Sequence, residues 1–127
     1  IIGPGFSKKV FDECELAQIL YIPGCASPTE IIKARESGLS IFKIFPETHL
    51  GGPEYLKSLI SALPWLKAIP AGGIKSNLNI IEEWFKAGAE AITIGSDLFG
   101  KYKLGDDLQR LKKDLSLILD AIERIKE

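Results

Sequence analysis

Short apolar segments alternate with amphipathic segments along the chain. Apolar segments of this length, hydrophobic on both faces and separated by helices, are typical of strands in a parallel sheet that helices cover. The pattern predicts five strands, at residues 1–2, 19–22, 41–45, 66–70 and 91–94. The amphipathic segments predict five helices, at residues 7–17, 28–37, 53–63, 79–87 and 107–126.

The expected helix ends carry recognisable capping residues. Ser27 is a predicted N-cap, with Pro28 at the first helical position and Glu30 three residues after the cap. Gly38 and Gly88 each follow an amphipathic segment and precede an apolar one, which predicts a C-terminal stop at both positions. The order helix, glycine, short link, strand therefore occurs twice, in "KARESGLSIFKIF" and "FKAGAEAITIG".

Two architectures contain parallel strands that alternate with helices: an open doubly wound sheet and a closed eight-stranded barrel. A complete barrel typically has about 250 residues, whereas this chain has 127 residues, enough for five strand-helix units. The pattern alone therefore indicates either an open sheet or the last five units of a barrel.

Glycine residues mark the loops that would follow the strands, where parallel α/β proteins bind their ligands. Gly72 and Gly73 follow the fourth expected strand, and Gly95 and Ser96 follow the fifth. Glycine lets backbone amides approach a ligand, and amides at the start of a helix form an anion site. At consecutive strand ends these residues indicate a phosphate site, while each glycine taken singly is explained by a tight turn.

Lys43 lies in the centre of the apolar segment "IFKIF". On a strand it shares a face with Ile41 and Phe45, while Phe42 and Ile44 point the other way. In a barrel that face is the interior, where burial lowers the pKa of an amine and lets it form a Schiff base. The alternative is an edge-strand lysine that reaches water. The turn that follows places Lys43 at the ligand end, so both interpretations stay open.

Four further residues invite a simpler interpretation. Glu47 and His49 follow the strand of Lys43 and could transfer a proton, but polar loop residues are usually solvated, so we expect both at the surface. Trp65 and Trp84 have no basic neighbours of the kind that accompany base stacking, and we expect them to pack against the core.

Composition and charge exclude several classes of partner. The 16 basic and 17 acidic residues give a net charge of -1, which is unlike a nucleic-acid-binding surface. No apolar run reaches the ~20 residues of a membrane span. Cys14 and Cys25, with one histidine in the chain, do not complete a zinc site and indicate free thiols in a reducing compartment. The sequence thus predicts a cytoplasmic protein with no nucleic-acid, membrane or metal partner.

Several motifs in order resemble the 2-keto-3-deoxy-6-phosphogluconate (KDPG) and 4-hydroxy-2-oxoglutarate (KHG) aldolases. "FKIFP" is similar to the family's "FKFFP", "YIPGCASPTE" to its "IPG" strand, and "IPAGGI" to its "PTGGI". "ITIGSDLF" is similar to the last strand with its Gly-Ser pair, and "IIGPGF" to the "SPG" segment. The likeness covers the chain as far as about Phe99, and several motifs in order are more specific than any one.

The resemblance implies a (β/α)8 TIM barrel of the class I aldolase type, usually a homotrimer, that cleaves its substrate through a lysine Schiff base without a metal or other cofactor. By resemblance, Lys43 is the lysine that forms the imine with pyruvate, and Phe45 is the aromatic residue beside it. The positions that match the phosphate-holding residues of a phosphorylated keto-acid substrate are Gly72, Gly73, Gly95 and Ser96.

The chain also departs from the family pattern. The family's first three strands, with a proton-transferring glutamate and a carboxylate-binding arginine, have no counterpart in these 127 residues. Ala71 stands in place of the usual threonine, and the loop after Pro46 reads "ETHLGG" where an alanine-acid pair is commoner. We therefore expect residues 1–127 to form a single domain, a partial barrel without the first three units and without the general acid/base.

The resulting prediction is a Schiff-base aldolase that cleaves KDPG, KHG or both. Its products would be pyruvate and either glyceraldehyde 3-phosphate or glyoxylate. Two alternatives stay open. One is another phosphate-binding barrel enzyme, such as an isomerase, in which Lys43 acts electrostatically. The other is a non-catalytic half-barrel that folds by association.

Overall fold

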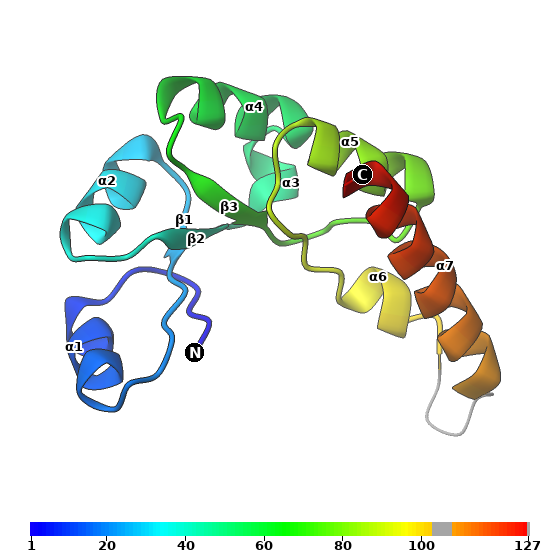
Figure 1. Ribbon diagram of the computed structural model, residues 1–127, viewed down its shortest axis with the longest axis horizontal. Coiled ribbons are helices and arrows are strands. Elements are labelled where there is room, and N and C mark those ends of the chain that lie inside the picture. Colours follow the sequence, from blue (N-terminus) through cyan, green and yellow to red (C-terminus); the bar gives the residue numbers. More distant parts are fainter. Residues whose placement is uncertain (103–107, 127) are drawn as a thin grey trace.

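A three-stranded parallel sheet with helices packed along it forms the centre of the computed structural model, which describes residues 1–102 and 108–126. The strands β1 (Gly24–Cys25), β2 (Ile41–Ile44) and β3 (Lys67–Pro70) lie in the order β1-β2-β3. Figure 1 shows the strands on the inner side of an open arc and the longer helices on its outer side. A parallel α/β fold is thereby confirmed; the described strands do not by themselves close a barrel.

Five longer helices occupy the segments that the amphipathic pattern predicts, to within a few residues. They are α1 (Lys8–Leu16), α2 (Pro28–Glu36), α4 (Pro53–Ala62), α5 (Leu78–Lys86) and α7 (Leu108–Lys126). The first residue of the last predicted helix, Asp107, lies outside the described residues. Within the described part of the chain, none of the helices combines the length and apolar character that a membrane crossing requires.

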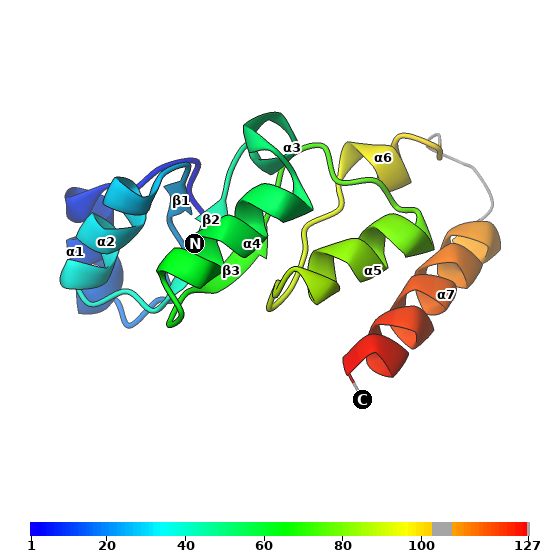
Figure 2. The ribbon, with the colours of Figure 1, turned by 90° about the horizontal axis from the view of Figure 1, so that it is seen from above.

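Two short helices, α3 (Glu47–Leu50) and α6 (Ser96–Phe99), were not predicted from the sequence. Each begins shortly after a segment for which a strand was predicted. Figure 2 shows α3 and α6 on the same edge of the molecule. This is the edge at which β2 ends, so both short helices lie where ligands of parallel α/β proteins bind.

The capping residues act as predicted. The Ser27 hydroxyl accepts a hydrogen bond from the backbone N–H of Glu30 at 3.4 Å, and the Glu30 carboxylate accepts one from Ala26 N–H at 2.7 Å. These contacts form a variant of the capping box at the start of α2, in which Glu30 reaches the residue before the N-cap. Gly38 and Gly88 follow α2 and α5 with φ angles of 107° and 101°, a region that favours glycine.

We expect the substitution Gly88→Ala to lower the free energy of unfolding by about 1–2 kcal/mol, because an L side chain is strained at positive φ. An added Cβ at Gly88 would also lie 2.7 Å from Cδ1 of Ile60. Urea denaturation measures the change. Gly5→Ala is the matched control, since a Cβ there meets nothing within 4 Å. Equal effects of the two substitutions would contradict the prediction.

The predicted strand at residues 19–22 is wrong in its bounds. Gln18 has a φ of 54°, and Ile19 N–H donates to the carbonyl of Cys14 at 2.8 Å, so the end of α1 occupies the start of this segment. The Ile1 amine donates to the carbonyl of Leu20 at 2.6 Å, and Ile22 forms an isolated parallel bridge with Ile2, so the segment pairs from Leu20 onward without forming a regular strand. The regular strand β1 begins two residues after Ile22.

The predicted strand at residues 91–94 is not regular in the structure. Glu90 and Thr93 donate backbone hydrogen bonds to the carbonyls of Ala68 and Pro70, at 3.0 and 3.1 Å, so the segment does lie beside β3. Pro70 has no N–H with which to return a bond. The ladder is therefore one-sided, and the segment runs along β3 without forming a strand.

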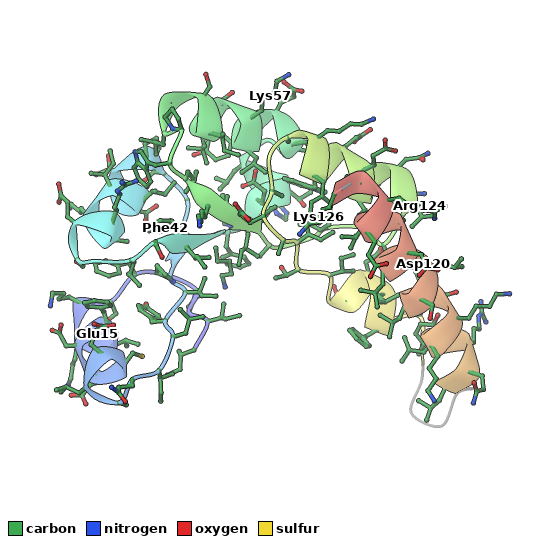
Figure 3. The ribbon with its side chains drawn as sticks, viewed as in Figure 1. Glu15, Phe42, Lys57, Asp120, Arg124 and Lys126 are labelled. Carbon is green, nitrogen blue, oxygen red and sulfur yellow. The ribbon has the colours of Figure 1, made fainter. Side chains whose placement is uncertain are left out.

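The core lies between the sheet and the helices. Phe42, labelled in Figure 3, is fully buried on the helix-facing side of β2 and meets the ring of Trp65 edge-on, with the centroids 6.1 Å apart. The guanidinium of Arg35 lies over the same Trp65 ring, with 3.7 Å between Cζ and the ring centroid. Trp84 is 2% exposed, so it packs in the core as predicted. A second cluster joins α5, α6 and α7 through Ile81, Leu98 and Ile118.

Both cysteines are buried free thiols, as predicted. Burial, with a smaller contribution from the negative charge of Glu30, raises the pKa of the Cys25 thiol to about 11. A thiol with this pKa stays protonated near neutral pH and is a poor nucleophile. Cys25 is thus a packing residue of β1.

Candidate active site

Lys43 is the third residue of β2, where it lies between Gly24 of β1 and Ile69 of β3. Burial alternates along β2: Phe42 and Ile44 are fully buried, whereas Ile41 and Lys43 are half-buried on the opposite face. Strand alternation thus directs the lysine away from the helix layer. As predicted, Lys43 lies on the same face of β2 as Ile41, opposite Phe42 and Ile44.

The ring of Phe45 lies beside the amine of Lys43, with 4.8 Å between Nζ and the ring centroid. At this distance the face of an aromatic ring attracts a cation. Phe45 is 37% exposed, so part of its ring remains open to solvent or ligand. The pair forms one wall of a pocket.

A pocket of about 380 Å³ opens at the carboxyl ends of β2 and β3, beside residues 93–96. It contains every site residue predicted from the sequence: Lys43, Phe45, Gly72, Gly73, Gly95 and Ser96. The other residues that line it are Ile2, Ala71, Ile74, Thr93 and Ile94. Predicted residues from three separate segments of the chain therefore converge at one place, as the strand-end argument predicts.

Gly72 and Gly73 form the turn after β3, with φ angles of 97° and 84°. A Cβ on Gly72 would lie 3.1 Å from the ring of Phe45, and one on Gly73 would lie 3.0 Å from Oγ1 of Thr48. Both positions thus need glycine for conformation and for space. The turn packs directly against the segment that carries Lys43.

Gly95 and Ser96 bound the pocket on the side of α6. Both residues are exposed, and a Cβ on Gly95 would meet nothing within 4 Å. Packing therefore does not require glycine at this position, in contrast to Gly72 and Gly73. The missing side chain leaves pocket space open for a ligand.

A charged cluster joins the two glycine-bearing loops and was not predicted from the sequence. The Asp97 carboxylate accepts hydrogen bonds at 2.8 Å from both the backbone N–H and the hydroxyl of Ser76. Lys75 Nζ lies 3.1 Å from the same carboxylate, and Lys101 Nζ donates to the Ser76 hydroxyl at 2.6 Å. The residues are about twenty positions apart in sequence, so no local motif identifies them.

Glu47 corrects a prediction: it is completely buried, not solvated. Among the described residues, neither of its carboxyl oxygens has a hydrogen-bond partner. Burial raises the pKa of Glu47 to about 7. Its charge also contributes, after burial, to the raised pKa of Tyr55. The backbone of Glu47 is held beside the turn after β3, since its N–H donates to the carbonyl of Ala71 at 2.9 Å. His49 is exposed, as predicted.

A larger depression of about 440 Å³ lies between α4 and α5. Four charged side chains line it, Glu54, Lys57, Glu83 and Lys86, together with Gly51, Pro53 and Ala87. It contains none of the predicted site residues, and it lies among helices instead of at the strand ends where ligands bind in this architecture. The smaller pocket around Lys43 is therefore the better candidate.

The fold and the pocket define a parallel α/β protein with a candidate ligand site at the carboxyl ends of its strands, between a lysine and glycine turns. The sequence model of the KDPG and KHG aldolase family matches residues 1–113, well over half of the chain. The chain belongs to this family.

Two curated relatives show how far the likeness extends. The 2-dehydro-3-deoxy-6-phosphogalactonate aldolase of Escherichia coli (strain K12) is 31% identical over 121 residues, which are 95% of this chain and 57% of that enzyme. The 2-dehydro-3-deoxy-phosphogluconate aldolase of Treponema pallidum is 38% identical over 77 residues, 61% of this chain and 37% of that enzyme. The chain thus spans little more than half of the longer match.

Solved structures give the same result. A native KDPGal structure superposes with a TM-score of 0.82 at 28% identity, covering 98% of this chain and 58% of the other. A KDPG aldolase from Legionella pneumophila, captured with pyruvate as a covalent carbinolamine intermediate, superposes with a TM-score of 0.67 at 26% identity. That match covers 98% of this chain and 56% of the Legionella enzyme.

Proposed function

We propose that the polypeptide containing this chain is a class I aldolase in which Lys43 forms a Schiff base with a 2-keto-3-deoxy sugar acid. The convergence of Lys43, the Gly72–Gly73 turn and the Gly95–Ser96 segment on one pocket carries the proposal. Family membership supports it. The covalent pyruvate adduct of the Legionella relative supports the same chemistry. The proposed substrates are KDPG, KHG or both.

In the proposed reaction the free amine of Lys43 attacks the C2 carbonyl and gives a carbinolamine, which loses water to form a protonated imine. The imine accepts the electron pair of the C3–C4 bond as that bond breaks, while the C4 hydroxyl loses its proton. The aldehyde that leaves is glyceraldehyde 3-phosphate or glyoxylate. Protonation of the resulting enamine at C3, followed by hydrolysis, releases pyruvate and regenerates the amine.

Phe45 has a defined part in this scheme. The protonated imine carries a positive charge at the position of the lysine nitrogen, 4.8 Å from the centroid of the Phe45 ring. A ring face at this distance stabilises a cation by about 0.5–2 kcal/mol, and more strongly when water is excluded. Phe45 therefore favours the cationic imine on which bond cleavage depends.

In this proposal residues 1–127 form one domain, which consists of the last five units of a (β/α)8 barrel. The whole protein is cytoplasmic and forms a homo-oligomer, which is a trimer by family resemblance. Leu16 and Leu20, near the end of α1, are 82% and 65% exposed. Apolar side chains this exposed supply surface that association would bury. The proton-transferring group belongs to the part of the family fold without a counterpart in these residues.

The test is covalent trapping. The polypeptide at its natural length is incubated with pyruvate and borohydride, and the product is examined by intact mass and peptide mapping. We expect one reduced pyruvate adduct, located on the peptide that contains Lys43. Lys67, on the adjacent strand β3 and exposed, serves as the internal control and should stay unmodified. An adduct on another lysine, or none on the folded protein, would refute the proposed role of Lys43.

A further inference from the structure

The Gly72–Gly73 turn and the Gly95–Ser96 segment belong to different strand-helix units, yet both line the pocket. Their relative position decides whether the two groups of backbone amides can contact the same ligand. Asp97, directly after Ser96, reaches across to Ser76, which follows the glycine turn. The contact between Asp97 and Ser76 therefore links the two pocket walls.

The link is built from strong interactions. One oxygen of the Asp97 carboxylate accepts two hydrogen bonds from Ser76 at 2.8 Å, and the other lies 3.1 Å from Lys75 Nζ. Hydrogen bonds to a charged group are about twice as strong as neutral ones. The Asp97 side chain is only 19% exposed, so solvent competes weakly for its carboxylate, whereas Lys75 is 62% exposed and its ion pair is screened by solvent. The Ser76 N–H and hydroxyl, with Lys75, hold the pKa of Asp97 well below its usual range.

The cluster also resolves an electrostatic conflict. A carboxylate beside a site for an anion would weaken binding if it acted alone. Lys75 and Lys101 lie 3.1 and 3.5 Å from the Asp97 carboxylate, so two positive charges surround one negative charge. The cluster therefore has a net charge of +1 and does not repel a phosphate.

We propose that Asp97 is a positioning residue that holds the Gly72–Gly73 turn and the Gly95–Ser96 segment in the arrangement that binds a phosphate group. The inference rests on the proposed function in one respect, since the phosphate is taken to belong to the substrate. It extends that function by separating two contributions of Asp97: its hydrogen bonds position the loops, while its charge opposes the ligand and is neutralised by two lysines.

The two contributions predict opposite results, which makes the test decisive. Binding of inorganic phosphate is measured by isothermal titration for Asp97→Ala and Asp97→Asn in the polypeptide at its natural length. Asp97→Ala removes the link, and we expect phosphate affinity to fall about tenfold, as for a displaced binding group. Asp97→Asn keeps an acceptor oxygen for Ser76 N–H and should retain phosphate affinity within about threefold of the original protein.

Substrate kinetics supply the second readout. For Asp97→Ala we expect KM for KDPG to rise about tenfold, while kcat/KM for KHG, which has no phosphate, stays within about twofold. Asp12→Asn is the matched control, because Asp12 pairs with Lys8 within α1 and does not line the pocket. This control should change neither the titration nor the kinetics.

Each other outcome has a definite meaning. Tighter phosphate binding by both Asp97 variants would show that only the charge matters and would overturn the inference. An original protein without phosphate affinity, or an equal loss for both substrates, would also overturn it. A protein that binds phosphate but forms no pyruvate adduct would refute the proposed function, while the titration of the Asp97 variants would still decide the positioning role.

Discussion

Aldol cleavage is expected to fall by about 10⁴-fold or more when Lys43 is replaced by arginine, as when the nucleophile of a covalent mechanism is lost. Arginine keeps the positive charge and a similar length, but its guanidinium is not deprotonated in proteins and cannot form the imine. The substitution therefore separates covalent catalysis from electrostatic catalysis at a single position. Steady-state cleavage of KDPG and KHG measures the effect.

The same variant distinguishes the proposed aldolase from a phosphate-binding enzyme in which Lys43 acts only as a charge. An electrostatic role would survive in part, with a loss of only about 10- to 100-fold, because the charge remains close to its original position. Lys67→Arg on β3 is the matched control, and it should leave cleavage unchanged because Lys67 is exposed and does not line the pocket. A Lys43→Arg variant with near-normal cleavage would exclude the Schiff-base mechanism.

The stability of the folded protein is expected to fall as the pH rises from about 4.5 to 7, because of Glu47. Its pKa is raised by burial from 4.5 to about 7. Below pH 4.5 the Glu47 carboxyl is protonated in both the folded and the unfolded chain, so ionisation of this group does not reduce the free energy of unfolding. Between the two pKa values the unfolded chain releases the proton first, which favours unfolding. Above pH 7 the loss is complete and amounts to ~3 kcal/mol.

Glu47→Gln should remove this dependence, since the amide does not titrate in this range. We expect the variant and the original protein to have similar free energies of unfolding at pH 4.5, and the variant to be more stable by up to ~3 kcal/mol at pH 8. Urea denaturation at the two pH values measures both quantities. Glu54→Gln, at an exposed position in the first turn of α4, is the control. A difference between Glu47→Gln and the original protein that is equal at both pH values would contradict the assignment.

Local sequence patterns were sufficient to single out several residues of the candidate site, although they left the role of each open. Lys43 is recognisable because a charged residue interrupts an apolar strand, and its facing follows from strand alternation alone. Gly72 and Gly73 are recognisable because their dipeptide follows a strand, and both have the positive φ that such a turn requires. The helices at residues 28–36 and 78–86 are delimited by caps that act within a few residues of the chain.

The features that escaped prediction depend on contacts between distant segments. The backbone of Glu47 is held by a hydrogen bond to Ala71, 24 positions further along the chain, and its side chain is buried at that place. Nothing in the local sequence "PETHL" distinguishes it from a solvated loop residue. The Asp97 cluster likewise spans two units. Near Ile22 the strand starts late because Gln18 terminates α1 in a left-handed conformation, and the cap bond from Ile19 N–H to Cys14 occupies the start of an otherwise strand-like segment.

The order of the strands has a consequence for how the protein acquires its shape. The sheet follows the order of the chain, β1-β2-β3, and Ile2 and residues 90–93 add at its two ends in the same sequence. Each pairing thus joins units that are consecutive in the chain, which keeps contact order below that of a parallel sheet whose strands pair out of chain order. Each strand that has joined the sheet exposes an edge, and the next strand along the chain pairs with that edge. The pocket draws on β2, β3 and residues 93–96, so we expect it to be assembled late, when the last of these segments has docked.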